Sequence, residues 1–356
     1  MSQPTALKVG VIGFGLSATA FHIPFITTSP SFKFVSVLRR QAGALEAFPE
    51  VKVYNDQEEF FKQDIDLVII TSPNTYHYSY AEAALKQGKH VIVEKPFTVT
   101  SEEGEKLISL AKEKNLVLSV FQNRRWDGDF LTIQKIFEEK KLGRVVDYES
   151  HFDRFRNKLK GNAWREEDQP GSGVLFDLAP HLFDQAFVLF GKPKYLSADI
   201  RNQRGLGNTD DYFELRLDYE DGLRVILKAG MLVADKGPHF TIHGTEGSFV
   251  KYGLDPQEDA LRAGKNPANV PAGTWGTEPE SLWGKLTTAG PDSSLNETRV
   301  PTLPGNYQGF FENVAETIRS GDHSKLIVKP EQAILSIKAI ELARVSNEKR
   351  AAVLFQ

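Results

Sequence analysis

The sequence predicts two domains: an α/β domain with a doubly wound parallel sheet, then an α+β domain with a mostly antiparallel sheet. Strand and helix patterns alternate up to about residue 122, and after Arg124 strand-like runs follow one another with few helices between them. A chain of 356 residues also exceeds the size at which a single core usually stops growing. We therefore place the first domain at residues 1–123 and the second at residues 124–356, with the C-terminal helix packing back on the first domain.

Residues 8–40 predict a β-α-β unit of the dinucleotide-binding type. An apolar run at 9–12 leads into a Gly-Phe-Gly turn, a helical stretch follows, and residues 34–38 form a second apolar strand. Gly13 permits a tight turn, Gly15 lets backbone approach a pyrophosphate, and N–H groups at the helix start attract its charge. Ala18 takes the third glycine position, which the pattern allows. The alternative is an ordinary strand-to-helix turn.

Two arginines follow the second strand and predict the choice of cofactor. Proteins that bind NAD usually place Asp or Glu there, to accept hydrogen bonds from the ribose 2′-hydroxyl. This chain has Arg39 and Arg40 instead. A guanidinium can pair with a 2′-phosphate, whereas a carboxylate would repel it. We therefore expect NADP, with NAD as the second choice, and the alternative is a solvated pair of loop charges.

Further elements complete the alternation in the first domain. A continuous apolar run predicts a buried parallel strand, and a helix with Ser101 as its N-cap lies later in the domain. The predicted elements are strands at 65–71, 90–93 and 117–121 and helices at 78–87 and 101–114.

The second half of the chain is richer in strands. We expect helices at 130–139, 178–189, 307–320 and 330–346 and strands at 144–153, 195–203, 212–218, 223–232, 240–243 and 248–252. Residues 253–304 are rich in Gly, Pro, Asn and Ser and give little periodic signal. Such a long stretch indicates a hairpin or a functional flap.

Composition excludes several classes of protein. The apolar fraction of 40% and the charged fraction of 25% fit a soluble globular protein, and a net charge of −4 gives no reason to expect nucleic-acid or membrane binding. The absence of cysteine excludes disulfides, thiolate catalysis and cysteine-based metal sites. With no apolar run near the ~20 residues that span a bilayer, and no signal-peptide pattern, we expect a cytoplasmic protein.

Polar groups follow the strands of the first domain, where ligands of open α/β sheets bind. Ser72, Asn74 and His77 come after one strand, and Glu94 and Lys95 after the next. The ammonium of Lys95 could donate to a substrate hydroxyl and stabilise the alkoxide that develops as hydride leaves carbon. The alternative for Lys95 is a surface lysine paired with Glu94.

A second group lies at the start of the helix predicted at 178–189. Asp177 would be at the helix edge and His181 one turn later, so that the two share a face. His181 is suited to accept an alcohol proton near neutral pH, and Asp177 to orient the imidazole or bind a neighbouring hydroxyl. The alternative is a helix cap and an interior histidine. A metal site of His151, Asp153, Asp177 and His181 can be assembled on paper, but nothing in the spacing demands it, and we expect none.

Four motifs together resemble the glucose–fructose oxidoreductase and inositol dehydrogenase family over nearly the whole chain. They are GFG at 13–15, EKP at 94–96, NRRWD at 123–127 and D-x-x-x-H at 177–181. Segments 123–133, 151–156 and 164–166 look most like the branch with NADP-dependent scyllo-inositol dehydrogenases. The chain departs from the family pattern at Ser172 and at residues 179–180, with Pro180 expected in the first helical turn, where proline is tolerated.

The resemblance implies a Rossmann domain followed by a large open-faced sheet, and association through that sheet as a homodimer or homotetramer. It makes His181 the acid/base, Lys95 the substrate-hydroxyl anchor and Asp177 the orienting carboxylate. The substrate contacts that we expect are Lys95, Asn123, Arg154, Arg156, Asp177 and His181. The cofactor contacts that we expect are Gly13, Phe14, Gly15, Leu16, Ser17, Arg39, Arg40, Ser72, Asn74, His77, Glu94, Lys95, Asn123, Trp164 and Arg165.

By this resemblance the chain is an NADP-dependent dehydrogenase of a cyclitol or sugar, with scyllo-inositol as the first choice. Two alternatives stay open. One is an NADPH-dependent reductase of a keto- or anhydrosugar, which would use the same residues in reverse. The other is a non-catalytic protein that senses NADP, because a fold alone does not fix a function.

Overall fold

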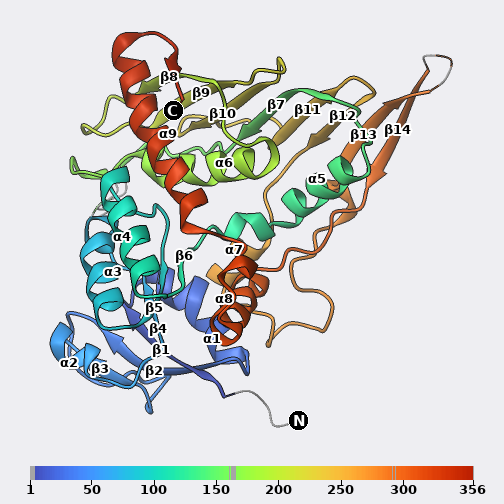
Figure 1. The fold of residues 1–356 in the computed structure, drawn as a ribbon. Coiled ribbons are helices and arrows are strands. Elements are labelled where there is room, and N and C mark those ends of the chain that lie inside the picture. The colour runs from blue at the N-terminus through green and yellow to red at the C-terminus, as the bar shows by residue number, and fades with distance from the viewer. Residues whose placement is uncertain (1–4, 160, 162–165, 291, 293, 356) are drawn as a thin grey trace. The chain divides into compact units, whose positions relative to one another are not determined.

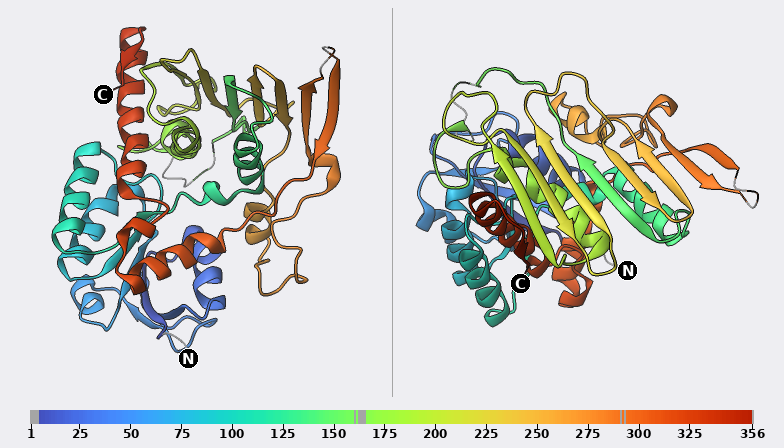
Figure 2. Two further views of the ribbon diagram at one scale, coloured as in Figure 1. Left: turned by 45° about the vertical axis from the view of Figure 1, so that its right-hand side comes forward. Right: turned by 90° about the horizontal axis from the view of Figure 1, so that it is seen from above.

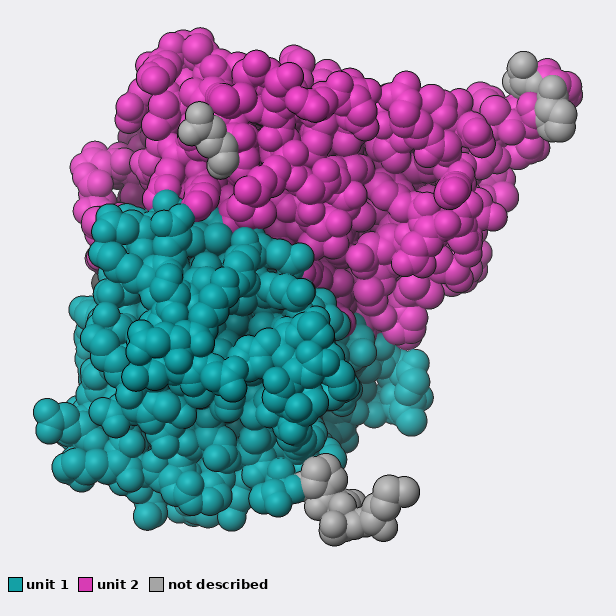
Figure 3. Space-filling view, in the orientation of Figure 1, with its two compact units in different colours: residues 1–123, 257–275, 306–334 teal, residues 124–256, 276–305, 335–356 magenta. Residues whose placement is uncertain are grey.

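The computed structural model describes residues 5–159, 161, 166–290, 292 and 294–355 (Figure 1). The chain forms two compact units (Figure 3). Each unit has its own sheet. Unit 1 contains residues 1–123, 257–275 and 306–334, and unit 2 contains residues 124–256, 276–305 and 335–356.

Unit 1 is built on a six-stranded sheet in which all neighbours are parallel. The strand order β3-β2-β1-β4-β5-β6 is that of a doubly wound dinucleotide-binding sheet, with the order reversing between β1 and β4. The side chains of β4 are buried throughout, as expected for a strand covered on both faces. The strands are β1 Leu7–Ile12, β2 Phe32–Leu38, β3 Lys52–Tyr54, β4 Leu67–Ile70, β5 His90–Val93 and β6 Leu118–Val120. The predicted parallel sheet is confirmed, and β3 is an addition to it.

Helices of unit 1 come from three parts of the chain. They are η1 Ser17–His22, α1 Ile23–Thr28, α2 Gln57–Phe61, η2 Asn74–Tyr76, α3 His77–Lys86, α4 Ser101–Glu113, α7 Gln257–Arg262, α8 Gln308–Ser320 and η6 His323–Lys325. We predicted Ser101 as the N-cap of α4, but the N-cap is Thr100. Thr100 and Glu103 form a reciprocal capping box, which satisfies two N–H groups at once.

Unit 2 contains a nine-stranded sheet of order β14-β13-β12-β11-β7-β10-β9-β8-β15. The pairing of β7 with β10 is parallel and the other pairings are antiparallel, so the predicted, mostly antiparallel sheet is confirmed. The strands are β7 Val145–His151, β8 Tyr195–Arg201, β9 Tyr212–Asp218, β10 Arg224–Gly230, β11 Phe240–Gly244, β12 Gly247–Lys251, β13 Gly284–Ala289, β14 Leu295–Val300 and β15 Val353–Leu354.

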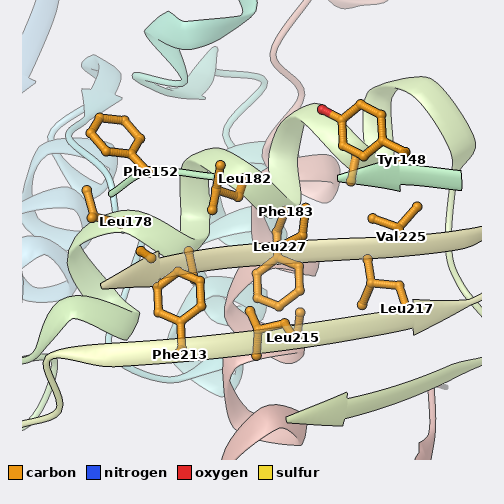
Figure 4. Packing of buried hydrophobic residues seen from close by; sticks show 14 of the residues in the cluster. Tyr148, Phe152, Leu178, Leu182, Phe183, Phe213, Leu215, Leu217, Val225 and Leu227 are labelled. Carbon is orange, nitrogen blue, oxygen red and sulfur yellow. The ribbon is translucent and has the colours of Figure 1, made fainter. Parts of the chain in front are cut away.

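The core of unit 2 lies on one face of this sheet. Helix α6 (Val174–Phe190) packs its side chains against the inward side chains of β9 and β10 (Figure 4). Helices α5 (Gly128–Glu138) and α9 (Pro330–Lys349) contribute further residues to the core. Outward side chains alternate with these and carry charge, for example Lys228 beside Glu214 at 3.6 Å. The right-hand view of Figure 2 shows the strands of this sheet from above.

The stretch 253–304, for which a hairpin or a functional flap was expected, contains a hairpin formed by β13 and β14 at the edge of the nine-stranded sheet. It also contains α7 and the short helix η5 (Glu280–Leu282), which were not predicted. Among the described residues, no helix combines the length and the apolar character that crossing a bilayer requires.

Candidate functional site

The glycine turn after β1 has the geometry that a phosphate-binding loop needs. The N–H of Gly13 donates to the carbonyl of Leu38 at 2.9 Å, and its φ of +93° lies in the left-handed region. A Cβ on Gly13 would lie 2.8 Å from Thr71 Oγ1, so a larger residue has no room. A Cβ on Gly15, in contrast, would meet no atom within 4 Å. The turn therefore packs tightly at Gly13 and leaves open space at Gly15, which fits the approach of a pyrophosphate.

The segment after the turn continues as a π-helix and not as a regular α-helix. This six-residue turn, η1, is followed directly by α1. Leu16 precedes it and is exposed, while the Ser17 hydroxyl at its start donates to the carboxylate of Glu94. Single π-helical turns occur often at functional sites.

The two arginines after β2 differ in their surroundings. Arg39 Nη2 donates to the carbonyl of Gly43 at 3.1 Å, and the guanidinium carbon lies 5.5 Å from the centre of the Phe14 ring. Arg40 is exposed. Arg39 is thus held beside the glycine turn, whereas no hydrogen bond or ring contact holds Arg40 within the described residues.

His77 ties two of the loops that end strands of unit 1. Its Nδ1 is 2.8 Å from the carbonyl of Pro96, and its Nε2 is 3.0 Å from that of Ser72. The ring is buried, and burial lowers the pKa of His77. Asn74, also expected to contact the cofactor, is buried on the same segment. Both ring nitrogens of His77 therefore lie within hydrogen-bonding distance of backbone carbonyls, and the neutral ring donates to one of them.

The carboxylate of Glu94 accepts hydrogen bonds on both of its oxygens. Its Oε1 accepts hydrogen bonds from Ser17 and from His22 Nε2, the latter at 2.8 Å, and its Oε2 accepts from the N–H of Lys95 at 3.0 Å. Burial alone would raise the pKa of Glu94, but the hydrogen bonds from His22 and Ser17 and the positive charge nearby lower it to about 2. Glu94 is therefore ionised at neutral pH.

In unit 2, α6 carries the Asp177 and His181 pair. The helix begins at Val174, four residues before the predicted start, with Gly173 as a cap that makes no side-chain bond. Asp177 therefore does not cap the helix: it lies in the first turn, where its N–H donates to the carbonyl of Gly173 at 3.1 Å. We predicted Pro180 in the first helical turn, but it lies in the helix interior. Because proline has no N–H, position 180 donates no hydrogen bond to the preceding turn. His181 is buried and follows Asp177 by four residues.

Arg154 joins Asp177 from the chain that follows β7. Its Nη1 lies 3.5 Å from Asp177 Oδ2, and its guanidinium carbon lies 4.9 Å from the centre of the Phe152 ring. Two of the residues expected to contact substrate are thus brought together. Arg156 is exposed, with its N–H donating to the carbonyl of Met231 at 2.7 Å.

The NRRWD motif anchors α6 by one buried ion pair and one hydrogen bond, and a second buried ion pair lies within the motif. Arg125 Nε and Nη2 each lie 2.7 Å from the carboxylate of Asp184, and Arg124 Nη1 lies 3.0 Å from Asp127 Oδ2. The Gln185 amide adds a hydrogen bond to the carbonyl of Arg124 at 3.0 Å. Asp184 was not singled out in the sequence, because its partner lies 59 residues away and no local pattern marks it.

Three further residues were expected to contact the cofactor. Asn123 is buried in the short helix η3 (Asn123–Trp126), and Trp164 and Arg165 lie outside the described residues. Lys95 belongs to unit 1, and Asp177 and His181 belong to unit 2. Over the described residues, no cluster of three or more His, Asp or Glu side chains is placed to hold a metal ion.

Two family models match the chain along almost its whole length. "Oxidoreductase family, NAD-binding Rossmann fold" matches residues 7–122, and "Oxidoreductase family, C-terminal alpha/beta domain" matches residues 134–354. The chain is 39% identical to scyllo-inositol 2-dehydrogenase (NADP(+)) IolW of Bacillus subtilis, over 98% of this chain and 96% of that protein. It is 40% identical to oxidoreductase YdgJ of Escherichia coli, over 97% of each. The structure of yvaA from Bacillus subtilis superposes with a TM-score of 0.93 at 38% identity, covering both chains completely.

Proposed function

This chain belongs to the glucose–fructose oxidoreductase and inositol dehydrogenase (Gfo/Idh/MocA) family, and on that premise we propose that it is an NADP-dependent dehydrogenase that oxidises a secondary carbinol of a cyclitol, with scyllo-inositol as the first choice. The family membership makes the chain an oxidoreductase with an NAD(P)-binding Rossmann domain. The substrate and the preference for NADP are the parts that we propose.

The observation that carries the proposal is the ion pair between Asp177, on the first turn of α6, and Arg154, in the chain that follows β7. Arg154 and Asp177 place a guanidinium and a carboxylate 3.5 Å apart, one helical turn from the imidazole of His181. Donors and acceptors in such a group suit a ring that bears several hydroxyls, because each hydroxyl can both donate and accept. A histidine beside them supplies the proton acceptor that alcohol oxidation requires.

The residues around the glycine turn fit a dinucleotide with a 2′-phosphate. The open space at Gly15 suits the pyrophosphate, and the guanidinium of Arg39 suits the phosphate on the ribose. When bound, the nicotinamide ring supplies the acceptor of the hydride. In the proposal Arg39 selects the cofactor, and Arg40 adds a screened surface charge.

The chemistry assigns one role to each group of the protein. His181 takes the hydroxyl proton as the carbinol carbon loses hydride, and the C–O single bond becomes a carbonyl. The Lys95 ammonium donates a hydrogen bond to the same oxygen and stabilises the negative charge that develops on it. Asp177, held by Arg154, binds a neighbouring hydroxyl and so fixes the register of the ring. In the reverse direction His181 returns the proton.

We further propose that the chain forms a homo-oligomer through the outward face of the nine-stranded sheet. This face carries cross-strand charges of both signs, including Arg224 beside Asp147 and Lys228 beside Glu214. Light scattering of the purified chain measures the number of subunits, and a monomer would exclude this part of the proposal.

Substitution of His181 by Asn tests the proposed chemistry. Asn keeps a polar side chain of similar size but cannot accept the proton, so we expect kcat to fall by about 10²–10⁴ while the Kd of NADP stays within about twofold. His243→Asn is the matched control, because His243 is exposed on β11 and hydrogen bonds to Ser248. A parallel loss of activity and of NADP binding in His181→Asn would assign a structural role to His181.

A further inference from the structure

A buried carboxylate links two segments of unit 1 that are far apart in the sequence, residues 17–22 and residues 94–95. Glu94 accepts hydrogen bonds from Ser17 at the start of η1, from His22 at its end and from the N–H of Lys95. These bonds use both carboxylate oxygens. The segment η1, which follows the glycine turn, and the backbone that bears Lys95 are therefore joined through the side chain of Glu94.

His22 anchors this carboxylate from the interior. Its side chain is fully buried, with the ring centroid 4.3 Å from that of Phe121 and 5.7 Å from that of Phe311. Its Nε2 lies 2.8 Å from Glu94 Oε1. Because an ionised carboxylate has no hydrogen to give, Nε2 is the donor. The aromatic rings fix the direction in which His22 donates, and hence the position of Glu94.

The backbone at Lys95 is held on both sides. The N–H of Lys95 donates to Glu94 Oε2 at 3.0 Å, and the carbonyl of Pro96 lies 2.8 Å from His77 Nδ1. The Glu94 and His77 side chains are both buried, so water competes poorly for these bonds. The start of the Lys95 side chain thus has a fixed position and direction.

We propose that His22 and Glu94 are positioning residues that place Lys95 for hydride transfer, and that Glu94 supports the segment after the glycine turn through Ser17 and His22 without contacting the cofactor. The inference rests on the role proposed above for Lys95. It replaces our sequence-based expectation that Glu94 contacts the cofactor directly. A displacement of a catalytic group by about 1 Å can cost about 10²-fold in rate, so loss of this support should appear in kcat.

Three variants of the full-length chain separate positioning from stability. His22→Leu removes the donor, and we expect kcat to fall by about 10–100-fold with the Kd of NADP within about threefold. His22→Gln keeps an N–H near Nε2 and should recover at least a third of the wild-type kcat. His90→Leu is the matched control: His90 begins the same strand, β5, and its Nδ1 accepts from Val117 at 2.9 Å, so this change should lower Tm and leave kcat unchanged.

A double-mutant cycle with Lys95→Met shows whether the effect passes through Lys95. If it does, His22→Leu lowers kcat in the wild type but by less than about twofold in the Lys95→Met background. An equal loss in both backgrounds would overturn the proposal. Glu94→Gln provides a second variant, because it replaces one acceptor of the carboxylate by an N–H₂ group. A Kd of NADP raised tenfold or more with kcat unchanged would instead make Glu94 a cofactor ligand.

A measurement that does not depend on turnover distinguishes failure of the proposed positioning by His22 and Glu94 from failure of the proposed dehydrogenase function. Trace acetylation followed by peptide mass spectrometry measures the reaction rate of the Lys95 amine in the cofactor-free chain. We expect His22→Leu and Glu94→Gln to raise this rate at least threefold and His90→Leu to leave it unchanged, with the exposed Lys62 as an internal reference. If the wild type oxidises no polyol but labelling changes in this way, the positioning holds and the proposed chemistry fails. If the wild type is active, and His22→Leu and Glu94→Gln change neither kcat nor the labelling rate of Lys95, the proposed positioning is wrong.

Discussion

We predict that replacement of Arg39 by Ala removes the proposed preference for NADP, so that the variant binds NADP and NAD alike. In the structure the guanidinium is held by the carbonyl of Gly43 at 3.1 Å and lies over the Phe14 ring at 5.5 Å. It is therefore oriented before any ligand arrives, and little conformational entropy is lost on binding. Arg40, being exposed, has no such support.

The size of the effect follows from these contacts. A hydrogen bond to a charged group contributes about 1.5–3 kcal/mol, which corresponds to a loss of about 10–150-fold in NADP affinity for Arg39→Ala. An exposed charge pair contributes about 0–1 kcal/mol, so Arg40→Ala should cost at most about fivefold. Phe14→Leu removes only the contact between the ring and the guanidinium, about 0.5–1 kcal/mol, and should weaken NADP binding about two- to fivefold.

Fluorescence titration with the reduced forms of both cofactors measures each Kd directly. We expect the Kd of NADH to stay within about twofold in all three variants, because NADH has no 2′-phosphate. The reasoning would be refuted by a larger loss in Arg40→Ala than in Arg39→Ala, or by equal losses for NADPH and NADH.

Three further outcomes can be measured by urea unfolding. Burial, together with the negative charge of Asp255, raises the pKa of Asp129 to about 7, so the folded state binds more protons than the unfolded state between about pH 4 and pH 7. The free energy of unfolding should therefore fall as pH rises through this window, and Asp129→Asn should flatten the slope. The lowered pKa of Glu94, about 2, gives the opposite pH dependence. The free energy of unfolding should decrease as pH falls from about 4.5 towards 2, by on the order of 3 kcal/mol. Glu94→Gln should abolish that decrease. Arg125→Gln should destabilise by about 3–5 kcal/mol because Asp184 is left buried without its bidentate partner, and a loss below about 1 kcal/mol would contradict this.

Long apolar runs made most of the fold predictable. The strand at 90–93 has the predicted bounds, and the predicted strand at 65–71 contains β4, Leu67–Ile70. Short elements were missed: β3 has three residues and α2 has five, too few for a period to show. The start of α6 was placed too late because Gly173 gives no side-chain cap, and the buried Val174, Leu175 and Phe176 look the same in a strand as in a helix.

The site could be predicted only where function and local pattern coincide. Lys95, Asp177 and His181 stand in short motifs, and their catalytic roles stay predictions. His22 and Asp184 carry no such signal, because each owes its place to a partner more than 50 residues away that folding brings within 2.8 Å. The difference between Arg39 and Arg40 likewise depends on where Gly43 and Phe14 lie, which two adjacent arginines in a sequence do not reveal.

Transfer of deuterium from a labelled substrate tests the proposed reaction most directly. scyllo-Inositol deuterated at its ring carbons is incubated with the purified chain and NADP, and the cofactor is analysed by mass spectrometry while absorbance follows the reduced nicotinamide. The proposal predicts a rise in absorbance, one deuterium on the nicotinamide and an inosose as product, with both signals at least about 10²-fold slower in His181→Asn. A chain that binds NADP tightly yet transfers no deuterium from scyllo-inositol or from any member of a panel of deuterated polyols and sugars would contradict it.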